Sequence, residues 1–120
     1  SHILDLTYAA DVAAAIVRVM ELLHAGESAL PPIHLVSGIG TTLGELAELA
    51  RSTANSRALL RDAAPRSYDV YRFVGDPCRA RTLLGWHATT PLKEGIARLL
   101  SNYSALTAEH HASHEGVCTT

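Results

Sequence analysis

The sequence predicts a single small α/β domain in which short strands alternate with helices. Apolar runs of strand length occupy residues 3–8 and 33–36, a helical apolar pattern follows each run, and clear start and stop signals bound the helices. A strand–helix–strand–helix order favours parallel pairing through right-handed crossovers. We therefore expect a layered α/β domain over residues 1–108, with short parallel strands and three to four helices.

Composition and charge exclude several classes of protein. The 120 residues are 48% apolar and 18% charged, which is typical of a chain that buries a core. The net charge of −2 gives no basic field that would attract a nucleic acid or an anionic membrane. No apolar run reaches the roughly 18 residues of a membrane-spanning helix, and no signal peptide is visible. With only two cysteines, Cys78 and Cys118, a reducing cytoplasm is the expected location.

The first helix is expected over residues 12–25, with Asp11 ahead of it and Gly26 ending it. Its polar positions, which include Arg18 and Glu21, lie on one narrow stripe, and apolar residues cover the rest of its circumference. A single small sheet does not need that much apolar helix surface. We therefore expect a further layer of protein on this helix, and self-association through the exposed apolar face where that layer is missing.

The next elements are indicated by local signals. Thr42 and Glu45 have the spacing of a capping box and predict a helix over residues 43–52. Residues 57–61 form a weaker candidate for a third strand.

Two further helices begin at proline. Asp76-Pro77 and Thr90-Pro91 each combine an N-cap residue with proline at the first helical position. Gly85 ends the first of these helices. The second carries five large apolar side chains along one face, namely Leu92, Ile96, Leu99, Leu100 and Tyr103.

A glycine-rich segment lies between a predicted strand and a helix, where backbone amides can bind phosphate. It covers residues 38–44, GIGTTLG. The third glycine comes one position too late for Gly-x-Gly-x-x-Gly, and no acidic residue follows about 20 positions later after a second strand. The favoured interpretation is a tight strand-to-helix turn, so no cofactor site is predicted in this chain.

The polar, His-rich residues 109–120 are expected to form a disordered tail. Four of its side chains are loosely spaced like metal ligands: His110, His111, His114 and Cys118. No apolar framework would hold them in place, so a physiological metal site is not predicted. Cys78 begins a predicted helix, but no spacing indicates a histidine partner, so no catalytic nucleophile is predicted either.

The best candidate binding residues are Arg66 and Asp69 in the segment RSYD. The planar guanidinium of arginine suits bidentate recognition of a diphosphate, and an aspartate three residues later is placed to accept from ribose hydroxyls. The alternative is a solvent-exposed ion pair within a loop. The residues alone leave both interpretations open.

Four segments in order resemble the NAD-dependent epimerase/dehydratase family, the extended short-chain dehydrogenases that act on sugar nucleotides. They are LDLTYAADVAAAI (4–16), IHLVSGIGTTLGELAELA (33–50), RSYDVYRFVGDPCRARTLLGW (66–86) and TPLKEGIARLL (90–100). The match spans residues 4–103 and corresponds to the C-terminal substrate-binding region of that family. The resemblance implies hydride transfer between a sugar nucleotide and tightly held NAD or NADP, leading to epimerisation, dehydration or decarboxylation.

The resemblance also implies roles for the two candidate residues. Arg66 would contact the diphosphate of a nucleotide sugar, and Asp69 would approach its ribose. The chain departs from the family pattern at several places: Leu4 stands where arginine is usual, His34 replaces asparagine, Val36 replaces glycine, and Ser67-Tyr68 replaces Pro-Gly. These changes alter the expected pocket and the loop that presents Arg66.

The catalytic motifs of the family are not found in this sequence. The glycine loop Gly-x-x-Gly-x-x-Gly and the Tyr-x-x-x-Lys pair are expected upstream, and none of the four tyrosines is followed by lysine four positions later. We therefore predict a C-terminal substrate-binding fragment, inactive alone, that binds a nucleotide-sugar diphosphate and joins a missing N-terminal Rossmann domain.

Two alternatives remain. One is a stand-alone, truncated, non-catalytic binding or interaction module of the same fold. The other is an unrelated α/β domain, which would be favoured if the strands at residues 3–8 and 33–36 were not parallel neighbours.

Overall fold

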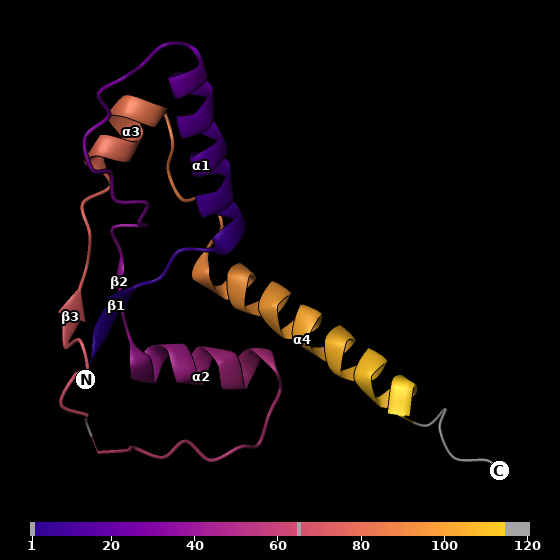
Figure 1. The fold of residues 1–120 in the computed structure, drawn as a ribbon. Helices are drawn as coiled ribbons and strands as arrows, with labels where there is room; N and C mark the ends of the chain where they lie inside the picture. Colours follow the sequence, from indigo (N-terminus) through magenta and orange to yellow (C-terminus); the bar gives the residue numbers. More distant parts are fainter. Residues whose placement is uncertain (1, 65, 115–120) are drawn as a thin grey trace.

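The computed structural model describes residues 2–64 and 66–114, with side chains as far as residue 105. These residues form a three-stranded sheet and four helices in the order β1, α1, β2, α2, β3, α3, α4 (Figure 1). The predicted small α/β fold with three to four helices is confirmed. None of the helices in the described part has the length and apolar character needed to cross a membrane.

The sheet is mixed rather than wholly parallel as predicted. Its central strand β1, Ile3–Asp5, pairs antiparallel with β2, Gly40–Thr42, and parallel with β3, Arg72–Phe73. The chain first passes the end of β1, where Asp5 accepts a hydrogen bond from the Ser37 amide at 2.9 Å. It then runs back along β1 to the strand's beginning, so β2 can pair only in the antiparallel direction.

The predicted strand at residues 33–36 pairs with no strand of the described chain, so its expected parallel pairing with residues 3–8 is wrong. Side chains hold this segment instead: Ile33 and Leu35 pack against the core, and Val36 is buried beside Gly75. A Cβ atom at Gly75 would lie 2.8 Å from a methyl carbon of Val36, so only glycine allows this approach.

The weak strand candidate at residues 57–61 is also wrong. The segment is exposed along its length and buries no apolar face that would fix it in a sheet. The third strand is β3, Arg72–Phe73, which lies 11 residues further along the chain than the end of the predicted strand.

Helix α1, Ala9–His24, begins earlier than predicted. Asp11 lies inside its first turn, because the carboxylate binds another part of the chain rather than capping its own helix. Gly26 lies just beyond the C-cap residue Ala25 and has φ of 104°, as predicted for a helix stop.

Helices α2 and α3 follow their local signals. Helix α2, Leu43–Thr53, opens with the predicted capping box, in which the Glu45 amide donates to Thr42 Oγ1 at 3.1 Å and the Thr42 amide donates to Glu45 Oε2 at 2.8 Å. Helix α3, Cys78–Leu84, starts after Asp76-Pro77 and ends at Gly85, whose φ of 61° is left-handed. These signals act within a few residues, which is why the sequence predicts them correctly.

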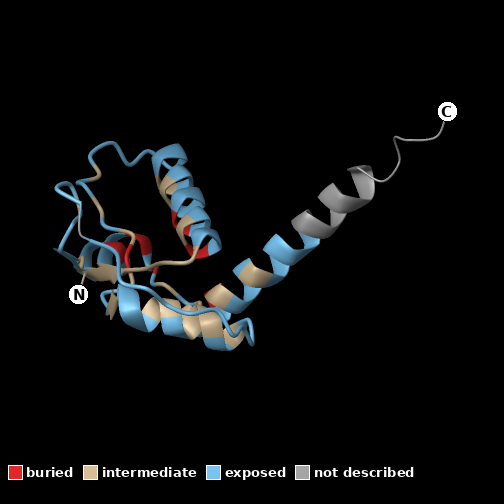
Figure 2. Ribbon diagram, turned by 90° about the horizontal axis from the view of Figure 1, so that it is seen from below, coloured by how far each residue is buried: buried red, intermediate tan, exposed pale blue. Residues whose placement is uncertain are grey.

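The core lies where α1 packs on α3, and it is small. Its buried members are Ala15, Ala80, Leu84 and Trp86. Figure 2 shows that the buried residues gather between these helices and that most of the remaining surface is exposed.

Helix α4, Leu92–His114, confirms the predicted helix start after Thr90-Pro91 and projects away from the other elements (Figures 1 and 2). The molecule measures 62 × 41 × 27 Å, with a radius of gyration of 19.3 Å. A compact domain of this length has a radius of gyration of about 14 Å. Residues 109–114 of the predicted disordered tail are the last residues of α4. Residues 115–120 and all side chains from residue 106 onward lie outside the description, so the rest of that prediction and the loose set of metal-like ligands stay untested.

Asp11 fixes α1 to the start of α4. Its carboxylate accepts hydrogen bonds from both the backbone amides and the hydroxyls of Thr89 and Thr90, at 2.8–3.1 Å. Its backbone carbonyl accepts from Trp86 Nε1 at 2.8 Å. Burial opposes ionisation of this carboxyl, but the four hydrogen bonds outweigh it and lower the pKa of Asp11 below its ordinary value.

We predict that Asp11→Asn lowers the free energy of unfolding by roughly 2–3 kcal/mol, because a charged acceptor of four hydrogen bonds is lost at a buried position. Urea denaturation followed by circular dichroism measures the change. Asp62→Asn, which alters an exposed loop carboxylate, serves as the matched control and should have little effect. Equal stability of the two variants would contradict the role given to Asp11.

The effect of Asp11 should also depend on pH in a defined direction. Since the pKa is lowered in the folded state, its contribution is present above the unfolded carboxyl pKa, here 3.8. The contribution is lost as the pH falls below 3.8 and through the lower folded-state pKa. The stability difference between wild type and Asp11→Asn should therefore be constant near neutral pH and shrink in this acidic range.

Candidate functional site

Arg66 and Asp69 are brought together in a tight turn between α2 and β3. The Arg66 amide donates to Asp69 Oδ2 at 2.8 Å, and the Asp69 amide donates to the Arg66 carbonyl at 3.1 Å. The guanidinium closes the turn, with Arg66 Nε donating to Asp69 Oδ1 at 3.2 Å. The three contacts fix the backbone from which the arginine side chain projects.

Asp69 is held in its ionised form. The hydrogen bond from the Arg66 amide is the main cause that lowers the pKa of Asp69, and the positive charges of Arg66 and His2 act in the same direction. Partial burial opposes this shift but does not cancel it. An ionised carboxylate is an acceptor only, so this group suits hydroxyl or N–H donors of a ligand.

The guanidinium of Arg66 is largely open to solvent, with 68% of the side chain exposed. Its Nη1 lies 3.5 Å from Tyr68 Oη, and its Cζ lies 5.2 Å from the centre of the Tyr68 ring. Within the described chain, Nη2 donates to no partner. The exposed ion pair that was the alternative interpretation is therefore present, and the same geometry leaves one edge of the guanidinium available.

Three aromatic rings beside this turn were not singled out by the sequence analysis as site residues. Tyr68 and Tyr71 lie on either side of Asp69 and are both exposed. The ring of His2 meets Tyr71 edge-on, with centroids 5.7 Å apart. Because the two tyrosines are so close to Asp69 in the sequence, they could have been predicted as part of the site. His2 comes from the far end of the sequence, so no sequence signal connects it with Asp69.

The glycine-rich loop is engaged by a carboxylate of the same chain. Asp5 accepts from the amides of Ser37 and Gly38 at 2.9 and 2.8 Å and from the Gly75 amide at 3.3 Å. The Ser37 hydroxyl adds a fourth bond of 2.6 Å. These amides are the groups that a phosphate would use, and a negative charge already lies among them. The arrangement is a structural junction of three segments.

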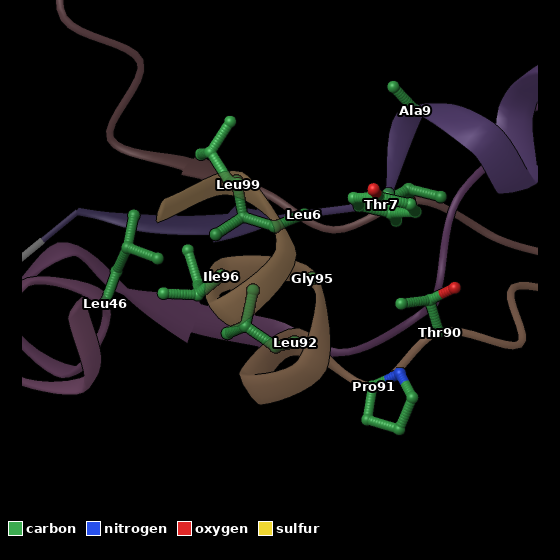
Figure 3. A pocket seen from close by; sticks show the side chains of 11 residues that line it. Leu6, Thr7, Ala9, Leu46, Thr90, Pro91, Leu92, Gly95, Ile96 and Leu99 are labelled. Carbon is green, nitrogen blue, oxygen red and sulfur yellow. The ribbon is translucent and has the colours of Figure 1, made fainter. Parts of the chain in front are cut away.

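An apolar cavity of about 360 Å³ lies at the base of α4 (Figure 3). Neither Arg66 nor Asp69 lines it. It is enclosed by the β1–α1 connection, α2 and α4, with Leu6, Leu46 and Ile96 among its lining residues. Thr7 Oγ1 is buried at its edge and has no hydrogen-bond partner among the described residues. The lining offers no ionisable pair for acid–base chemistry, and the described residues contain no cluster of potential metal ligands.

Known proteins resemble this chain as follows. No protein-family model matches it. UDP-glucuronic acid decarboxylase 1 of Danio rerio is 30% identical over 84 residues, which are 70% of this chain and 20% of the decarboxylase. The structure of UDP-glucose 4-epimerase from Thermotoga maritima with UDP-glucose matches 88% of this chain and 33% of the epimerase, with a TM-score of 0.79 and 23% identity.

A second epimerase structure extends the likeness. UDP-glucose 4-epimerase from Stenotrophomonas maltophila, with bound NAD and formylated UDP-arabinopyranose, matches 92% of this chain and 32% of the epimerase, with a TM-score of 0.81 and 23% identity. This chain has the fold of NAD-dependent epimerase/dehydratase enzymes. It spans about a third of the epimerase chains. The lack of pairing at residues 33–36 therefore does not indicate an unrelated fold.

We predict that Tyr68 shields the Arg66 side chain. The Arg66 side-chain protons should be shifted upfield in NMR spectra of the wild type, because they lie over the face of an aromatic ring. Tyr68→Phe retains the ring and should keep the shift, whereas Tyr68→Gly should remove it. Unchanged Arg66 resonances in Tyr68→Gly would contradict the stacked geometry.

Proposed function

We propose that this chain is the substrate-binding part of an NAD-dependent sugar-nucleotide epimerase, dehydratase or decarboxylase. The observation that carries the proposal is the exposed Arg66–Asp69 turn, which lies at the position that the family resemblance gives to nucleotide binding. The likeness of fold to two UDP-glucose 4-epimerases and the sequence match to a UDP-glucuronic acid decarboxylase support it.

The geometry of the turn gives a mechanism for binding. The two N–H groups on Nη2 of Arg66 have no acceptor among the described residues and could bind a phosphate oxygen. A diphosphate carries enough charge to compete with Asp69 for Nε. When Nε moves to the phosphate, Asp69 Oδ1 is released, because Arg66 Nε is its only hydrogen-bond donor in the described chain. The released oxygen can then accept from a ribose hydroxyl. Asp69 Oδ2 keeps its bond to the Arg66 amide throughout, so the turn stays formed.

The cofactor would be held outside this chain. The amides of the glycine-rich loop donate to Asp5, whose charge would repel a pyrophosphate, so the described residues do not fit NAD or NADP. We assign cofactor binding and the catalytic Tyr-x-x-x-Lys to an N-terminal Rossmann domain of a longer polypeptide. The role of this chain in the reaction is then to bind and orient the nucleotide sugar, and it is inactive alone.

A stand-alone, non-catalytic module is the second candidate. It is favoured by the apolar side chains that α1 exposes, because such a face would allow two copies to associate. The four side chains are 50–63% exposed: Ile16, Val17, Met20 and Leu23. In either case we place the protein in the cytoplasm, where a free thiol such as that of Cys78 persists.

We predict that Arg66→Ala weakens binding of UDP by on the order of 10- to 100-fold, because hydrogen bonds from a cation to phosphate are lost. The dissociation constant is measured by NMR titration of the amides of residues 66–71, with UMP as the monophosphate comparison. Arg57→Ala removes an exposed arginine from the preceding loop and is the matched control.

Two results would overturn this assignment. One is equal affinity of the Arg66→Ala and Arg57→Ala variants for UDP. The other is a wild-type chain whose residues 66–71 show no response to millimolar UDP.

A further inference from the structure

Helix α4 carries an apolar stripe, the α4 stripe, along one side. Its positions follow one another at alternating intervals of four and three residues: Leu92, Ile96, Leu99, Tyr103 and, next in the sequence, Leu106. This alternation is the spacing of the a and d positions of a heptad, which lie on the line along which one helix packs against another. The α4 stripe therefore suits contact with a second helix.

Within the described chain, only the base of the α4 stripe is covered. Leu92 and Ile96 are half-buried and line the cavity together with Leu46 of α2 (Figure 3). Leu99 lines the same cavity, yet its side chain is 60% exposed. Tyr103 is 66% exposed and lies further out, where α4 projects from the other elements (Figures 1 and 2). The stripe thus continues from the cavity onto the uncovered part of the helix.

The α4 stripe carries no charge. In the described part of α4 the charged side chains are Lys93, Glu94 and Arg98, and none of them belongs to the stripe. Glu94 and Arg98 form an ion pair with each other on the opposite side of the helix. Two identical stripes can therefore face each other without repulsion between like charges. A second copy of α4 supplies an apolar stripe with the same spacing.

We infer that two copies of this chain pair through their α4 stripes, with the two helices antiparallel. The base of each stripe already faces its own α2, so a parallel arrangement would bring both bodies to the same end of the pair. In the antiparallel arrangement, Leu99 of one copy lies level with Tyr103 of the other, and a two-fold axis repeats this contact. The inference does not depend on the proposed function.

The size of this interface sets its strength. Helix α4 has 23 residues and is about 35 Å long, but its base is covered by its own body. Contact over about two heptads would bury on the order of 1,000 Å² in total, which is near the lower limit for a specific interface. We therefore expect a weak dimer with a dissociation constant on the order of 10–100 µM.

Sedimentation velocity of the 120-residue chain at about 5 µM and about 500 µM tests the inference, because this range spans the expected dissociation constant. The wild type should change from monomer to dimer. Leu99→Glu places a charge on the stripe and should remain monomeric at both concentrations. Ser101→Glu adds the same charge on the opposite side of α4 and is the matched control, which should dimerise like the wild type.

The folding of each variant is checked by circular dichroism. Tyr103→Glu lies outside the cavity lining and replaces Leu99→Glu if that variant does not fold. It should also remain monomeric.

Spin labels report the direction of pairing, in a chain whose native thiols are removed by Cys78→Ser and Cys118→Ser. Labels on Ser101→Cys lie near the two-fold axis and should be close together. Labels on Lys93→Cys should be separated by about 24 Å along the helix axis, because eight residues lie between each label and the two-fold axis. Equal label distances at the two positions would contradict the antiparallel arrangement.

Three results would overturn the inference. One is a wild-type chain that stays monomeric at the higher concentration, and another is equal dimerisation of Leu99→Glu and Ser101→Glu. Met20→Glu charges the exposed apolar face of α1 and should leave the dimer intact. Loss of the dimer in Met20→Glu alone would assign the interface to α1 instead. The proposed function is tested separately, by UDP binding.

Discussion

The structure depends on the carboxylate of Asp11, which connects segments almost 80 positions apart in the sequence. The first turn of α1, the indole of Trp86 and the start of α4 all meet at this residue. A buried charge is tolerated only when hydrogen bonds replace its water, and here four donors do so. Because the apolar core is small, this junction and the one at Asp5 place the helices and strands relative to one another.

The sequence predicts those parts of the fold that depend on interactions between residues close together in the chain. The capping box at Thr42, the proline start of α3 and the stop at Gly85 are complete within a few neighbouring residues, so their sequence signals suffice. Strand pairing is different. The antiparallel direction of β2 depends on contacts of Asp5 with residues more than 30 positions away, and no local pattern encodes them.

The candidate site likewise has parts that depend on neighbouring residues and parts that depend on segments distant in sequence. Arg66 and Asp69 are three residues apart, so a turn brings them together as their spacing suggested. The approach of His2 to Tyr71 and the cavity at the base of α4 arise from segments distant in sequence. Residues 33–36 show a further limit: the apolar run indicated a buried strand, yet no strand of the described chain pairs with it. A sequence pattern reports the environment to which a segment is suited, whether or not the described chain supplies that environment.

The central claim is that this chain is one part of a larger sugar-nucleotide enzyme, and sequencing the coding DNA upstream of Ser1 tests it most directly. We expect an in-frame extension long enough to supply the two thirds of the epimerase chains that this sequence does not cover. That extension should encode a Gly-x-x-Gly-x-x-Gly loop and a Tyr-x-x-x-Lys pair. A start codon next to Ser1, preceded by an in-frame stop, would contradict this claim and leave a stand-alone module.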